Sequence, residues 1–218
     1  EVVVTTQTDT RWLFSCRSDV EELVSYLDVA TEAWKRLENH LDDARAHLVD
    51  AGQGREDHEY DAALSAVDRA SAAIESARHR ESEFVPAGVP AMAERIERTA
   101  ERVREARVET REARATHNLN RAERLWRDDE YCPAHEAFGE AHDDYVRALA
   151  VSEADFEASA GLRKKLARVE RNLTALEQAP LDRGDKARDR AYETDDPGLA
   201  LRAKHAVADR LVFEQVRE

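Results

Sequence analysis

The chain has 218 residues and a net charge of −14, with 37% charged residues, 42% hydrophobic residues, 7 Gly and 5 Pro. Ala is abundant (37 residues) and Ile is rare (2 residues). This composition excludes collagen, a disulfide scaffold and a membrane-spanning protein, and it disfavours folds that need many β-branched strands. A mostly helical protein is therefore predicted.

Residues 1–17 differ in composition from the rest of the chain. Val3 lies in a run of three valines, and Trp12 and Phe14 belong to a second apolar patch. Because β-branched and aromatic residues favour extended structure, we expect an extended N-terminal arm here. Its apolar side chains need a covering surface, so Val3, Trp12 and Phe14 are candidates for binding a protein partner.

Three helices are predicted next. The first begins at the capping box Ser18–Glu21, ends near Gly52 and Gly54, and should bury Leu27, Trp34, Leu37 and Leu41. The second covers residues 56–80. After a loop at 84–90, the third helix covers residues 91–127, with Pro90 in its first turn. The third helix carries a ridge of glutamates, which is typical of a solvated face.

A fourth helix is predicted after a turn at residues 129–133. Ser159-Ala160-Gly161 predicts a kink or break, and Leu162 to Leu176 form a short coiled-coil-like seam that ends at Ala179-Pro180. Residues 181–196 are polar and carry no prediction, and a last helix begins at Asp196-Pro197. We therefore predict an all-α fold of long antiparallel helices, as a helical bundle or hairpin stack. The helical body covers residues 18–178, and a C-terminal helical segment covers residues 179–218.

Two stretches of the sequence match at an offset of 71 residues. They are Tyr60, Ala63, Val67 and Ala70, and Tyr131, Ala134, Phe138 and Ala141. The pattern resembles the second half of a tetratricopeptide-like repeat, in which small residues let two helices approach closely. That family repeats every 34 residues, and its Trp-Leu-Gly signature is absent here, so a generic helical hairpin is the alternative. The resemblance implies a protein-interaction surface, with Tyr60 and Tyr131 as candidate contact residues.

The charge balance indicates the solvent and the class of partner. An acidic excess with 28 Arg and only 5 Lys resembles proteins of salt-accumulating halophilic archaea, although a high-GC bacterial genome also favours Ala and Arg. Net negative charge disfavours binding to nucleic acid and to anionic lipid. Cys16 and Cys132 do not make a disulfide framework, and the sequence contains no signal peptide and no membrane-spanning run. We therefore expect a cytoplasmic protein.

The sequence contains no strong catalytic motif. Cys132, His135 and His142 are the best metal-like set, but a closed zinc site usually needs four ligands and no second pair follows. Acidic pairs at 128–129 and 143–144 are expected by chance at this composition. We therefore expect no cofactor, no metal and no enzyme activity.

The leading hypothesis is a non-enzymatic helical interaction or scaffold protein with protein partners, which forms a homodimer at high salt. Two alternatives stay open. One is a metal-binding or enzymatic helical domain that uses residues 128–145. The other is a coiled-coil component of a larger membrane- or chromosome-associated machine.

Overall fold

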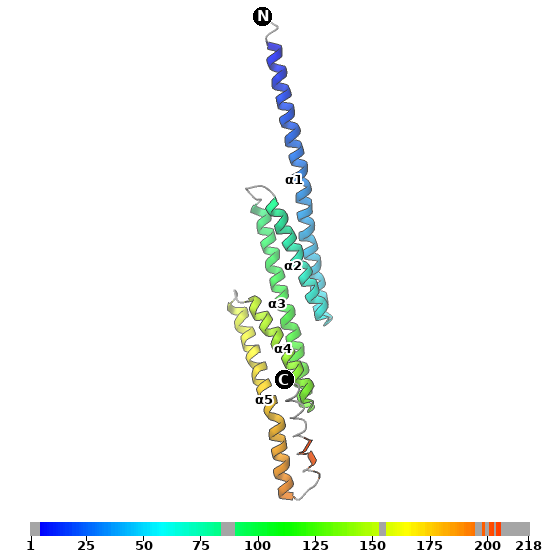
Figure 1. The fold of residues 1–218 in the computed structure, drawn as a ribbon, viewed down its shortest axis with the longest axis vertical. Coiled ribbons are helices and arrows are strands. Elements are labelled where there is room, and N and C mark those ends of the chain that lie inside the picture. Colours follow the sequence, from blue (N-terminus) through cyan, green and yellow to red (C-terminus); the bar gives the residue numbers. More distant parts are fainter. Residues whose placement is uncertain are drawn as a thin grey trace. The chain divides into compact units, whose positions relative to one another are not determined.

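The computed structural model describes residues 5–83, 90–152 and 156–194, with positions 198, 201–202 and 204–205. They form α1 (Thr5–Glu56), α2 (Tyr60–Glu83), α3 (Pro90–Arg127), α4 (Tyr131–Ser152) and α5 (Phe156–Thr194) (Figure 1). The predicted all-α class is confirmed. Across the described residues, no helix offers an apolar stretch long enough to cross a bilayer.

The start of the first helix was predicted wrongly. Residues 5–17 belong to α1, so the expected extended arm is helical there, and the helix runs through the capping box at Ser18. No Gly or Pro occurs between Thr5 and Ala51. A β-branched residue lowers helix stability by only a few tenths of a kcal/mol, so a helix propagates through Thr and Val when nothing interrupts it. Val3 lies outside the described residues.

The predicted helix end at Ala179-Pro180 was wrong, and of the kink or break predicted at residues 159–161 the break is not found. α5 runs through Gly161 and through Pro180, whereas the described part of α4 ends earlier, at Ser152. Gly161 has open space around it and lowers helix propensity by only about 1 kcal/mol. Pro180 removes one backbone donor, at about 3 kcal/mol, from a helix of 39 residues. The predicted loop at 84–89 and the helix start at 196–197 lie outside the described residues.

The chain divides into two compact units, and α3 contributes to both. Unit 1 contains Glu1–Asp50 and Ala66–Val103. As predicted, Leu37 and Leu41 of α1 are buried in it, while Trp34 is half-buried and the side chain of Leu27 lies outside the description. The other core residues of this unit come from all three of its helices: Ala44, Ala66, Val67, Ala70, Ile74, Ala77, Met92, Ile96, Ala100 and Val103.

Unit 2 contains Ala51–Ser65 and Arg104–Glu218, and its core lies among α3, α4 and α5. Phe138 and Tyr145 are its largest fully buried side chains, and the Tyr145 hydroxyl lies 3.0 Å from Thr116 Oγ1 of α3. The other buried residues of α4 are Tyr131, Ala134, Ala137, Ala141, Asp144, Ala148 and Ser152. Because these alanines are small, the neighbouring helices approach closely, and Asp144 is the one charged residue of α4 that is buried with them.

The two helix-to-helix turns of the repeat have the same hydrogen bonds. His58 and Asp129 both adopt positive φ, at 62° and 63°. The following N–H donates to a carbonyl five residues back, Glu59 to Gly54 and Glu130 to Leu125. These are Schellman ends, which close a helix with one left-handed residue. Burial repeats at the same offset: Ala51 and Ala122, Ala63 and Ala134, Val67 and Phe138, Ala70 and Ala141, Ile74 and Tyr145, and Ala77 and Ala148.

Candidate functional site

The turn between α1 and α2 places Tyr60 on the surface of unit 2. The carbonyl of Glu59 accepts a hydrogen bond from the Ala63 N–H at 2.9 Å, so Tyr60 is the first helical residue of α2. The backbone at the start of α2 passes close to Gly54 near the end of α1, since a Cβ on Gly54 would lie 3.2 Å from the Ala63 nitrogen. Glycine at this position therefore lets the two ends of the hairpin meet and fixes the direction of Tyr60.

Tyr60 belongs to a cluster of three rings. Its hydroxyl lies 2.9 Å from His58 Nδ1, and its ring centroid lies 5.5 Å from that of His117 on α3. The two imidazoles are 5.8 Å apart. Tyr60 is half-buried, while His58 and His117 are exposed. The cluster therefore exposes flat ring surfaces and hydrogen-bonding atoms on unit 2.

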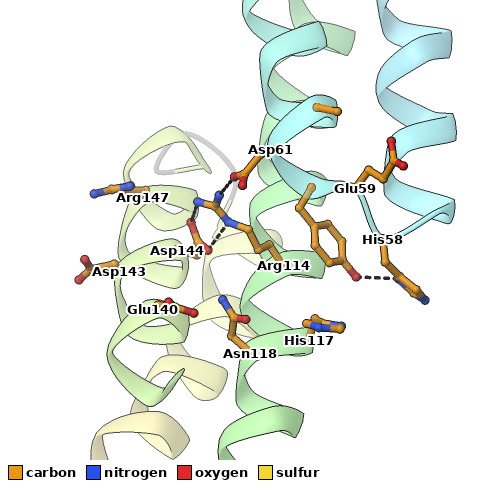
Figure 2. A pocket seen from close by; sticks show the side chains of 12 residues that line it. His58, Glu59, Asp61, Arg114, His117, Asn118, Glu140, Asp143, Asp144 and Arg147 are labelled. Atoms are coloured by element: carbon orange, nitrogen blue, oxygen red, sulfur yellow. Dashed lines mark hydrogen bonds and ion pairs between the residues drawn. The ribbon is translucent and has the colours of Figure 1, made fainter. Parts of the chain in front are cut away.

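Arg114 of α3 joins two acidic side chains beside the ring cluster. Its Nε and Nη2 donate to Asp144 of α4 at 2.6 Å each, and its Nη1 donates to Asp61 of α2 at 2.6 Å. Figure 2 shows the guanidinium of Arg114 between the two carboxylates. The side chain of Asp144 is only 3% exposed, whereas that of Asp61 is 93% exposed. The bidentate contact to Asp144 is the strong part of this network.

A second arginine shares the buried carboxylate. Arg111 Nη1 lies 3.7 Å from Asp144 Oδ1, and the Nε and Nη1 atoms of Arg111 are buried without a hydrogen-bond partner among the described residues. Burial lowers the pKa of Arg111 below its ordinary value, against the attraction of Asp144. The hydrogen bonds that Arg114 donates to Asp144 raise the pKa of Arg114. One buried carboxylate therefore balances two guanidinium groups.

The ring cluster and the arginine network line an open recess of about 630 Å³ on unit 2. Its wall also contains Glu59, Asn118, Glu140, Asp143 and Arg147. A second hollow of about 590 Å³ shares His58, Tyr60 and His117. These surfaces combine hydrogen-bond acceptors, hydrogen-bond donors and ring faces.

The equivalent tyrosine of the second hairpin has a different environment. Tyr131 is 8% exposed, and its hydroxyl donates to Asp129 Oδ1 at 3.0 Å. Its ring packs in the core of unit 2, where Trp126 and Phe138 meet edge to face. Tyr131 is therefore a core residue with a satisfied hydroxyl, whereas Tyr60 is partly accessible.

The other sequence candidates are the N-terminal aromatic residues and the metal-like set that contains His142. Trp12 and Phe14 belong to α1, and their side chains lie outside the description. His142 lies 3.7 Å from Asp143 and 3.8 Å from Glu170. In the parts of the chain that the structure describes, no group of three or more His, Cys, Asp or Glu could hold a metal ion.

Sequence reasoning missed Arg114, Asp144, His58 and His117 as members of one site. The Asp143–Asp144 pair and the Tyr60 turn were visible signals, but Arg114 and Asp144 are 30 residues apart in the chain. Comparison with family models, with curated proteins and with solved structures finds no match to this chain.

Proposed function

We propose that this chain is a non-enzymatic helical interaction protein, which acts as a scaffold by holding partner proteins on repeated helical hairpins. The observation that carries the proposal is the pair of Schellman turns with matched burial at an offset of 71 residues. Repetition of a hairpin builds a surface from equivalent positions, on which sequence differences select partners. The tetratricopeptide-like resemblance supports the same function.

The recess around Tyr60 is the proposed partner site. The first and second hairpins share their turn, yet Tyr131 is buried while Tyr60 stays accessible beside His58 and His117. Tyrosine contributes strongly to protein interfaces because it combines a large ring with a hydroxyl. The bidentate Arg114–Asp144 pair supports this site, since it fixes α4 against α3 beside the recess.

The composition supports a halophile cytoplasm as the working environment. The described surface carries many exposed ion pairs, such as Arg78 with Glu97 and Arg98 with Glu94. The excess of acidic over basic residues, 47 against 33, would hold water and cations at molar salt, where the Debye length falls to about 3 Å and repulsion among carboxylates is screened. Partner binding should therefore be measured at high salt.

The experiment is site-specific photocrosslinking in cells that make the protein natively. A photoreactive phenylalanine analogue replaces His117 at the recess, and the control carries the same analogue at the exposed Glu75 of α2. We expect a protein adduct at position 117 that is absent at position 75 and lost when Tyr60→Ala is added. Equal labelling at both positions, or no protein adduct at 117, contradicts the proposal.

A further inference from the structure

The helix α1 carries an unbroken heptad seam. Apolar residues occupy its a and d positions in alternating steps of three and four: Leu13, Cys16, Val20, Leu23, Leu27, Ala30, Trp34, Leu37, Leu41, Ala44, Leu48 and Ala51. A strict seven-residue period turns one face of a helix toward a neighbour and favours left-handed coiling. The whole seam is therefore built for helix packing.

Only part of this seam is covered within unit 1. Leu37, Leu41 and Ala44 are fully buried, whereas Val20 is 56% exposed and Val24, beside it at an e position, is 50% exposed. Among the described side chains of residues 20–33, none is fully buried. The seam thus continues ahead of the segment that packs in unit 1, and its described positions there include the exposed apolar side chains of Val20 and Val24.

From Val20 to Trp34 the packing face carries no charge, whereas Arg17 and Asp19, just ahead of it, occupy an e and a g position. Between Val20 and Trp34, the a, d, e and g positions hold only uncharged residues. The four acids of this stretch, Glu21, Glu22, Asp28 and Glu32, all fall at b, c or f positions. A chain with a net charge of −14 repels its own copies, so a neutral face is where self-association meets least opposition.

The segment is complementary to itself in one antiparallel register. When Val20 faces Ala30 of the partner subunit, Leu23 faces the partner's Leu27 and Cys16 faces the partner's Trp34. Each small residue then meets a large one, which fills space evenly along the seam. A parallel pair would place Trp34 against the partner's Trp34 and Ala30 against the partner's Ala30. The two Trp side chains would then be crowded, and a gap would remain between the two Ala side chains.

We propose that residues 16–34 of α1 pair antiparallel with the same segment of a second copy of this chain, in the register that sets Val20 opposite the partner's Ala30. The segment is about 28 Å long at 1.5 Å per residue. This inference deepens the proposed function, on which it rests, by naming a second copy as one protein partner and α1 as the surface that binds it.

Cysteine crosslinking tests the register. The variant Val20→Cys/Ala30→Cys is made in a background of Cys16→Ala/Cys132→Ala and oxidised mildly at about 2 M KCl, where carboxylate repulsion is screened. Positions 20 and 30 of one helix are about 15 Å apart, too far for an internal disulfide. We expect a covalent dimer of twice the 24.7 kDa chain mass from the double variant and none from either single variant. Equal crosslinking by the single variants would indicate a parallel pair and overturn the proposal.

Light scattering of the full chain tests the surface independently. We expect a dimer across the micromolar range that Leu23→Asp/Leu27→Asp converts to a monomer, while the control Val49→Asp, at a site 72% exposed, leaves the dimer intact. A wild-type monomer throughout this range, or a dimer that survives the Leu23/Leu27 change, overturns the inference. If the wild-type chain is a monomer but the photoreactive analogue at position 117 still crosslinks a protein, this inference fails and the proposed function stands.

Discussion

Removing the charge of Asp144 tests the buried network of unit 2. Asp144→Asn keeps the shape of the side chain but leaves Arg111 and Arg114 without their shared carboxylate. The two hydrogen bonds of 2.6 Å from Arg114 are each worth about 1.5–3 kcal/mol, because both partners are charged. The amide oxygen of Asn still accepts one neutral bond worth about 1 kcal/mol. We therefore expect a loss of about 3 kcal/mol, within the range for breaking a buried pair.

Thermal and urea unfolding, followed by circular dichroism, measure this loss. For a chain of this size, about 3 kcal/mol lowers Tm by roughly 6–12 °C. The matched control is Asp61→Asn, because Asp61 binds the same guanidinium but is 93% exposed and should contribute less than about 1 kcal/mol. The loss from Asp144→Asn should persist at about 1 M KCl, since salt screens a buried pair weakly.

Two results would refute this reasoning. A loss below about 1 kcal/mol for Asp144→Asn would show that the guanidinium groups are solvated in the folded protein. An equal loss for Asp61→Asn would show that exposure does not decide the strength of these contacts. A double-mutant cycle with Arg114→Met assigns the coupling to this pair.

Four further predictions follow from the fold. Gly52→Ala should stabilise α1 by about 0.5–1 kcal/mol because its Cβ meets open space, whereas Gly54→Ala should destabilise it because the Cβ crowds Ala63; urea titration compares them. Leu37→Ala should cost about 2–5 kcal/mol in the same assay, and a cost below about 0.5 kcal/mol would contradict burial of this face. The Tm should rise steeply between about 0.1 and 2 M KCl, and a flat profile would refute salt adaptation. The hydrogen bond to Glu112 raises the pKa of Lys165, so this pair stabilises the fold below the unfolded pKa of about 10.4. That stability is lost as pH rises through the folded pKa, and Lys165→Ala should flatten the alkaline part of a Tm profile.

The sequence alone determined the helical class and the repeated hairpin, because both depend on local signals. Steps of three and four between apolar residues predicted the core positions Leu37 and Leu41, which are buried. The Tyr60 and Tyr131 matches fell at two turns that have the same hydrogen bonds. About ten consecutive positions of the sequence are enough to recognise the small residues at helix contacts and the left-handed residue at each helix end.

The predictions from sequence were wrong where a local signal against helix formation lay within a long helix. Valines and threonines near the N-terminus indicated an extended arm, but residues 5–17 continue α1 because nothing interrupts its hydrogen-bond ladder. Pro180 indicated a helix end, but α5 tolerates the loss of one donor and continues to Thr194. In both cases the cooperative gain of a long helix exceeds a local penalty.

Tertiary structure alone decided the members of the candidate site. The chain has 28 arginines and many acids, and nothing local distinguishes Arg114 and Asp144 from the others. Packing of α4 against α3 brings these two together, and packing of the Tyr60 turn adds Asp61 and the histidine rings. Which charged residues pair is decided by distance and burial after the helices pack together. Exposed ion pairs contribute little to stability, so one exposed partner can replace another, whereas a buried carboxylate needs its specific partner.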